Sequence, residues 1–162
     1  MYSRVKKFLS LSFDEKLIFV EAVALLPVIR VVLRLFGLRG SQRFLGLAAL
    51  GRNIDRAELG VERISYLVCA AANNGLLRAN CLERSLLLWS LLRRRGYAAD
   101  IRIGVSNEAK QFKAHAWVEM NGVVLNDRLD VAAEFAPFSG AIDLSAPASK
   151  LRSMQSREYG AP

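Results

Sequence analysis

The chain has 162 residues, of which 52% are hydrophobic and 23% are charged. This length suits one domain, and the composition excludes a disordered or low-complexity protein. Lysine and arginine number 23 against 15 acidic residues, and the net charge of +8 favours an acidic peptide, nucleic acid or an anionic membrane face as partner. Two cysteines are too few for a disulfide scaffold, and with a single histidine they make a poor inventory for a structural zinc site.

The N-terminal third of the chain is predicted to be helical. Ser12 with Glu15 three residues later is typical of a capping box, and the apolar run after it predicts a helix from Phe13 to about Phe36 with a kink at Pro27. Charges interrupt this run too often for a transmembrane span, which needs about 20 apolar residues, and no secretory signal is evident. We therefore expect a cytoplasmic protein whose first helix covers the core, with docking to a partner or membrane face as the alternative.

Two more helices are expected before the first strand. Apolar residues at helical spacing predict a helix over 56–72, in which Cys69 is expected to be a buried, inert thiol. A further helix is predicted to begin at Cys81 and to stop at Gly96, with one apolar face made by Leu82, Leu86, Trp89 and Leu92. The arginines at 93–95 fall in its last turn, where positive charge suits the helix dipole.

After Gly96 the apolar pattern changes to a period of two. Strands are predicted over 98–106, 112–120 and 123–126, and Asn121-Gly122 is a strong hairpin signal between the last two. Helices followed by an antiparallel meander indicate an α+β protein, with N-terminal helices packed on a small antiparallel sheet. We divide the chain into an N-terminal helical segment (1–60), a core (61–145) and an irregular tail (146–162), and expect residues from Ala132 onward to be irregular.

Cys81 and His115 carry the candidate chemistry. A cysteine at a helix start meets unpaired N–H groups and the positive end of the dipole, which stabilise a thiolate and a developing oxyanion, although a small buried residue would occupy the same position. His115 shares a strand face with Trp117 and Glu119, opposite the apolar face. A lone histidine is more often structural than catalytic. Together, however, the two residues have the composition of a thiol nucleophile and its base.

Such a pair needs a third group to orient the imidazole, and Asp127 is the candidate. A strict two-residue turn at Asn121-Gly122 would put Asp127 on the wrong face of the sheet and Asn126 on the histidine face. A one-residue bulge would bring Asp127 round beside the histidine. Asn126 is therefore the alternative orienting residue, and Asp130 is a weaker one.

Several of these segments together resemble a known family. The sequence is similar to the leader peptidases of lasso-peptide biosynthesis, which belong to the transglutaminase-like, papain-like superfamily of cysteine peptidases. The similarity covers about residues 80–138 and extends more loosely through the N-terminal helix. It is carried by Cys81-Leu-Glu-Arg-Ser-Leu86, the arginine-rich helix end, Ile103-Gly-Val105, Ala114-His-Ala-Trp-Val-Glu119 and Asn126-Asp127.

The resemblance implies a role for each residue of the pair and its partner. Cys81 would be the nucleophile, His115 the general base and acid, and Asp127 rather than Asn126 the orienting carboxylate. The reaction would be removal of the leader peptide from a ribosomally made precursor, after which a separate ATP-dependent cyclase would close the macrolactam. In some members of this family the peptidase is fused to an N-terminal leader-recognition domain, which needs strands. Because the first 60 residues look helical instead, we expect this chain to depend on a separate leader-recognition protein. No metal or organic cofactor is expected, and the expected location is the bacterial cytoplasm.

Two other functions remain open at this stage. A transglutaminase-like acyl transferase or amidase would use the same three residues. A non-catalytic basic binding module would fit the charge, but no helix-turn-helix, zinc-finger or ribonucleoprotein pattern is present, so a nucleic-acid partner is not expected.

Overall fold

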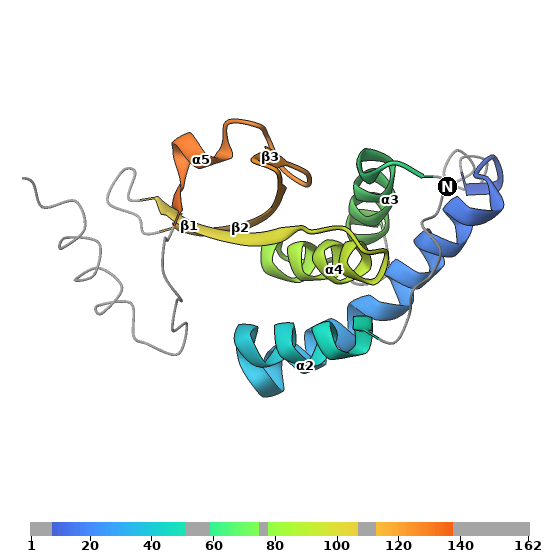
Figure 1. Ribbon diagram of the computed structural model, residues 1–162, viewed down its shortest axis with the longest axis horizontal. Coiled ribbons are helices and arrows are strands. Elements are labelled where there is room, and N and C mark those ends of the chain that lie inside the picture. The colour runs from blue at the N-terminus through green and yellow to red at the C-terminus, as the bar shows by residue number, and fades with distance from the viewer. Residues whose placement is uncertain (1–7, 51–58, 75–77, 107–112, 138–162) are drawn as a thin grey trace, which may run out of the picture.

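The computed structural model describes residues 8–50, 59–74, 78–106 and 113–137. The chain is an α+β protein, as predicted: helices come first and a small antiparallel sheet follows them (Figure 1). The elements in chain order are α2 (Phe13–Leu50), α3 (Val61–Asn74), α4 (Cys81–Arg94), β1 (Asp100–Ser106), β2 (Lys113–Met120), β3 (Val123–Val124), α5 (Val131–Glu134) and β4 (Ala136–Pro137).

The long helix α2 consists of two helical parts joined by a sharp bend at Gly37. Gly37 has φ 62° and ψ −173°, while Pro27 keeps helical dihedral angles. The predicted end near Phe36 is therefore confirmed, and the break in the helix lies at a residue that tolerates positive φ rather than at Pro27, where the helical dihedral angles continue. The second part turns back beside the first (Figure 1). A Cβ on Gly40 would lie only 2.6 Å from the Cβ of Phe36, so this bend requires glycine there as well.

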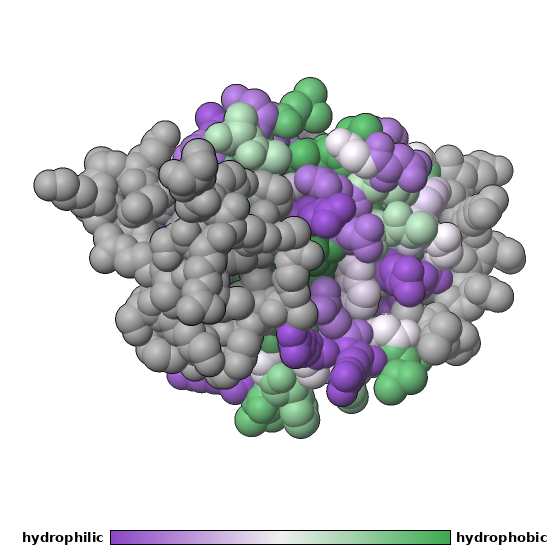
Figure 2. Space-filling view, turned by 60° about the vertical axis from the view of Figure 1, so that its left-hand side comes forward, coloured by the Kyte–Doolittle hydropathy of each residue, from purple (hydrophilic) through white to green (hydrophobic). Residues whose placement is uncertain are grey.

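The first part of α2 covers the core, as expected. One face packs into the main hydrophobic cluster through Ile18, Ala22, Leu26 and Ile29. The opposite face exposes apolar side chains, among them Phe13, Leu17, Val31 and Leu35. Figure 2 shows hydrophobic residues also at the lower edge of one face of the molecule, where the bend of α2 lies in Figure 1. In the described part of the chain, no helix combines the length and hydrophobicity that crossing a membrane requires.

The helix α4 lies at the centre of the fold. It packs against α2, α3 and the sheet, so every residue from Ser85 to Leu92 is buried. The predicted apolar face is buried at Leu86, Trp89 and Leu92, and the other sides are buried as well because three neighbours surround the helix. Two of the arginines in its last turn form ion pairs in addition to lying at the negative end of the helix dipole. Arg94 and Arg95 are buried, and they bind Glu21 of α2 at 3.2 and 2.8 Å.

The helix α3 begins later than predicted, at Val61 rather than residue 56. The Gly60 carbonyl accepts the N–H groups of Arg63 and Ile64, which marks the first turn, and residues 51–58 lie outside the described residues. The helix then runs to Asn74, two residues beyond the predicted end.

The sheet has four strands in the order β3-β2-β1-β4. The hairpin from β2 to β3 has a two-residue turn with positive φ at both Asn121 and Gly122, as predicted. β1 and β2 pair from 100 to 106 and from 113 to 119, whereas the predicted starts at 98 and 112 are not confirmed: β1 begins at Asp100, and residue 112 lies outside the described residues. β3 ends at Val124, two residues earlier than predicted.

The segment after β3 crosses the outer face of the sheet. It forms α5 and then β4, which pairs with β1 at Gly104↔Pro137 and Val105↔Ala136. The prediction of irregular structure from residue 132 onward is therefore wrong as far as residue 137, while the predicted tail at 146–162 lies outside the described residues. Trp117, Val131 and Phe135 form a second small hydrophobic cluster under this segment. Both faces of the sheet are thus covered around His115.

Candidate active site

The first turn of α4 is built around a capping box. The Asn80 side chain accepts the Glu83 N–H at 2.8 Å, and the Glu83 carboxylate accepts the Asn80 N–H at 3.1 Å. Glu83 is held in turn by Arg30 of α2, at 2.7 and 2.9 Å. Cys81 is the first residue of this helix and is partly buried. The box leaves the N–H groups of Cys81 and Leu82 with no acceptor in the described part of the chain, so both can face an anion.

His115 and Asp127 form a close pair. The Nε2 atom of His115 lies 2.7 Å from Oδ2 of Asp127. This contact leaves the other ring nitrogen, Nδ1, for a second partner. The ring of Phe135 packs against the imidazole with centroids 4.9 Å apart, which holds the ring from the side of the outer segment.

The way Asp127 reaches His115 differs from the predicted route. The turn is the strict two-residue form without a bulge, and the Leu125 N–H still bonds to the Val118 carbonyl at 2.9 Å. The strand has already ended at Val124, however, so the alternation of faces no longer governs residue 127. The carboxylate is therefore free to approach the histidine from the loop that follows.

Asn126 does not orient the imidazole. Its Oδ1 accepts the Val118 N–H at 2.8 Å, and its Nδ2 donates to Ser85 Oγ at 3.0 Å. Ser85 Oγ donates to the Ala116 carbonyl at 2.9 Å. Asn126 thus ties α4, β2 and the loop together. Asp130 is exposed and faces Arg128, so neither alternative from the sequence occupies the place beside His115.

Arg84 is a site residue that the sequence reasoning missed. Its Nη2 atom lies 3.5 Å from the same Asp127 oxygen that binds His115. Arg84 does not pair with Glu119, whose carboxylate binds the Trp117 indole at 2.7 Å and Arg102 at 3.1 Å. Its position in the sequence could have identified it. Arg84 follows Cys81 by three residues and therefore lies on the same face of the helix.

The first turn of α4 lies against the edge that carries the His115–Asp127 pair. Arg84 contacts Asp127, and Ser85 contacts the carbonyl of Ala116, the residue after His115. Cys81 precedes these two residues by three and four positions, so helical geometry puts it on the same face. The assignment of Cys81, His115 and Asp127 as the catalytic residues stays a prediction, and the joining of Asp127 to His115 and to the Cys81 helix supports it.

The electrostatics of this edge favour an ionised Asp127. Burial opposes ionisation, but the hydrogen bonds from His115 and the Arg128 N–H, with the charges of His115 and Arg84, outweigh it and lower the pKa of Asp127 below its ordinary value. Burial raises the pKa of the Cys69 thiol and so favours its protonated form, while the side chain is partly rather than fully buried. No group of three or more possible metal ligands occurs among the described residues.

A comparison with known protein families finds a match over most of the chain. The model of the transglutaminase-like superfamily matches residues 23–140, which is more than half of the chain and includes most of α2. A search of curated proteins and a search of solved structures both returned no match. This superfamily includes cysteine peptidases and acyltransferases and is typically enzymatic. The chain belongs to the transglutaminase-like superfamily.

Proposed function

We propose that this protein is a cysteine peptidase of the bacterial cytoplasm that removes the leader peptide from a lasso-peptide precursor, acting with a separate leader-recognition protein. The proposal rests on the resemblance of residues 80–138 to lasso-peptide leader peptidases, within the superfamily to which the chain belongs. The observation that carries it is the 2.7 Å pairing of His115 Nε2 with Asp127 beside the first turn of the Cys81 helix.

In the proposed reaction, Cys81 and His115 each have a defined role. With Nε2 bound to Asp127, the free Nδ1 of His115 takes the proton from the Cys81 thiol. The sulfur attacks the scissile carbonyl, and the Cys81 N–H stabilises the oxyanion. The imidazolium then protonates the leaving amine, which departs with the core peptide and leaves the leader as a thioester on Cys81. Water, deprotonated by His115, hydrolyses the thioester and restores the thiol.

The test is incubation of the purified chain with a lasso precursor peptide and its leader-recognition protein, followed by mass spectrometry. Two products are expected whose masses sum to the precursor plus one water. Cys81→Ala and His115→Ala should each lower the rate by at least about a thousandfold. Cys69→Ala is the matched control, since it removes the other thiol and should leave cleavage intact.

The same experiment separates the alternatives. Addition of a primary amine distinguishes hydrolysis from acyl transfer, because a transferase would give a product carrying the amine in place of water. Cleavage that persists in Cys81→Ala would disprove the nucleophile assignment. Full activity without the leader-recognition protein would disprove the dependence on that partner.

A further inference from the structure

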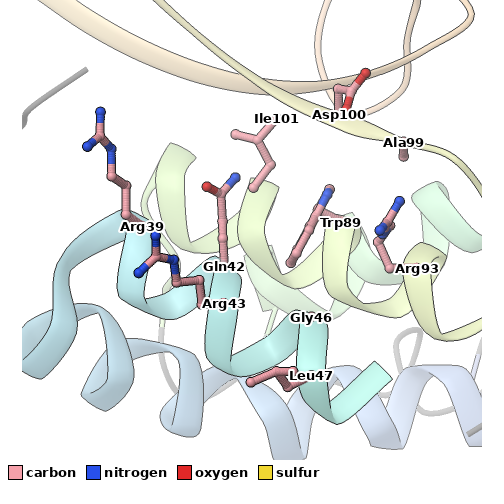
Figure 3. A pocket seen from close by; sticks show the side chains of 10 residues that line it. All are labelled: Arg39, Gln42, Arg43, Gly46, Leu47, Trp89, Arg93, Ala99, Asp100 and Ile101. Carbon is pink, nitrogen blue, oxygen red and sulfur yellow. The ribbon is translucent and has the colours of Figure 1, made fainter. Parts of the chain in front are cut away.

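A groove lies at the opposite end of α4 from Cys81. Its volume is about 890 Å³, and its walls come from the second part of α2, the C-terminal half of α4 and the start of β1 (Figure 3). Figure 3 shows side chains of α2 and α4 facing the first residues of β1 across it. Arg39, Arg43 and Arg93 supply positive charge, while Leu47, Trp89 and Ile101 supply apolar surface.

The positive charge of this groove is not neutralised within the described residues. Arg94 and Arg95 are paired with Glu21, but their neighbour Arg93 forms no ion pair with a described acid and lies over the Trp89 ring at 5.9 Å. Arg39 and Arg43 likewise have no acidic partner in the described part of the chain, and Asp100 is the one acid that lines the groove there. Three guanidinium groups on one groove match carboxylates well, because each can bind two oxygens at once.

The groove runs beside an open strand edge. β1 pairs with β2 over its whole length, but β4 covers its other edge only at Gly104 and Val105. Along residues 100–103 no described strand pairs on that side. Alternate backbone N–H and C=O groups of such an edge point outward, and an extended peptide can bind them as an added strand.

We propose that this arginine groove binds an acidic, extended segment of the substrate polypeptide. The segment adds to the edge of β1 at residues 100–103 and directs its carboxylates to Arg39, Arg43 and Arg93. The identity of the polypeptide as substrate rests on the proposed function, whereas the binding itself does not use Cys81. From Cys81 to Arg93 the helix rises about 18 Å, so the bound segment lies roughly five or six extended residues away from the scissile bond.

The test uses the full chain carrying Cys81→Ala, so that binding is measured without cleavage. The probe is a fluorescein-labelled nine-residue peptide of alternating Glu and Thr, and binding is followed by fluorescence anisotropy at low and physiological salt. We expect saturable binding that weakens with salt. Arg39→Gln combined with Arg93→Gln should weaken it at least tenfold. Arg63→Gln, a surface arginine on α3 paired with Glu15, is the matched control and should change affinity less than twofold.

Two further probes test the mode of binding. The same peptide with alternate amides N-methylated should bind at least tenfold more weakly, because methylation blocks strand addition; equal binding would overturn the strand-pairing model. A peptide of alternating Lys and Thr should not bind. An oligo(dT) strand that binds as tightly as the acidic peptide, with the same arginine dependence, would overturn the assignment to peptide.

The outcomes also separate this inference from the proposed function. If the acidic peptide fails to bind while a precursor is still cleaved through Cys81, the groove inference is wrong and the proposed function stands. If the peptide binds through Arg39 and Arg93 but no precursor is cleaved, the groove is confirmed as a peptide-binding site and the proposed function is wrong.

Discussion

The same oxygen of Asp127, Oδ2, lies 2.7 Å from His115 Nε2 and 3.5 Å from Arg84 Nη2. We therefore predict that Arg84 positions the Asp127 carboxylate and acts on the histidine through it. Because the Arg84 charge contributes to the lowered pKa of Asp127, we expect Arg84→Gln to raise that pKa toward its ordinary value of 3.8. The measurement is an NMR titration of the Asp127 carboxyl carbon. Arg102→Gln, which removes an exposed arginine bound to Glu119, is the control and should leave the titration unchanged.

Glu83 should make the stability of the protein depend on acid pH. The hydrogen bond from Arg30 outweighs burial and, with the Asn80 N–H and the Arg30 charge, lowers the pKa of Glu83 below its ordinary value of 4.5. An ionised Glu83 thus stabilises the fold above that value, and this stabilisation is lost as the pH falls through the lowered pKa.

We therefore expect Glu83→Gln to be less stable than the native protein at pH 7 and the difference to shrink as the pH falls below 4.5. Urea unfolding at several pH values measures it. Glutamine still accepts the Asn80 N–H, so the capping box is preserved. Glu62→Gln on the exposed side of α3 should show no comparable trend, and a difference constant from pH 7 to pH 3 would contradict the prediction.

The residues of the candidate site could be identified from the sequence, but the way in which they contact one another could be predicted only in part. Cys81 and His115 were visible because a helix start and a strand face follow from local pattern. The alternation of faces placed Asp127 wrongly, because it assumes a strand that continues to residue 126. Where the strand ends depends on Asn126, whose side chain takes over the bond to Val118, and no local pattern contains that contact.

The hydrogen bonds of Asn126 and Ser85 join α4 to the sheet. Asn126 is 8% exposed, and its loss would leave the Val118 N–H buried without an acceptor. We expect Asn126→Ala to lower the free energy of unfolding by about 1–3 kcal/mol, measured by urea titration. Asn73→Ala, at an exposed position of α3, is the control and should stay within about 0.5 kcal/mol of the native protein. Equal stability of the two variants would argue against this connection.

Helices proved easier to predict than short strands for a physical reason. The bounds of α4 and the end of the first part of α2 follow from apolar spacing closed by Gly96 and Gly37, which are signals within the sequence. The strands β3 and β4 contain two residues each, which is too few to show a periodic apolar pattern. β4 exists because the chain crosses the sheet and meets β1, and that encounter is a property of tertiary structure.

The segment from residue 125 to 137 joins the two edges of the sheet and covers the face opposite α4. It leaves β3 at one edge, packs Val131 and Phe135 on Trp117, and pairs with β1 at the other edge. Its close approach depends on Gly104, which stands opposite His115 in the β1–β2 register. This segment consequently contacts His115 at two places. Asp127 near the start of the segment binds the imidazole, and Phe135 near its end packs against the ring.

Gly104→Ala tests whether this segment holds the site. An added Cβ would lie 2.8 Å from the Phe135 carbonyl oxygen and 2.9 Å from the Trp117 indole, too close for either to remain in place. We expect a loss of about 1–3 kcal/mol in unfolding free energy, together with loss of the His115–Phe135 ring contact in NMR spectra. Gly46→Ala is the matched control: its Cβ would meet Trp89 at an ordinary 3.8 Å, and helix propensity favours alanine there by up to about 1 kcal/mol. A Gly104→Ala protein with native stability and an intact ring contact would show that the outer segment does not position His115.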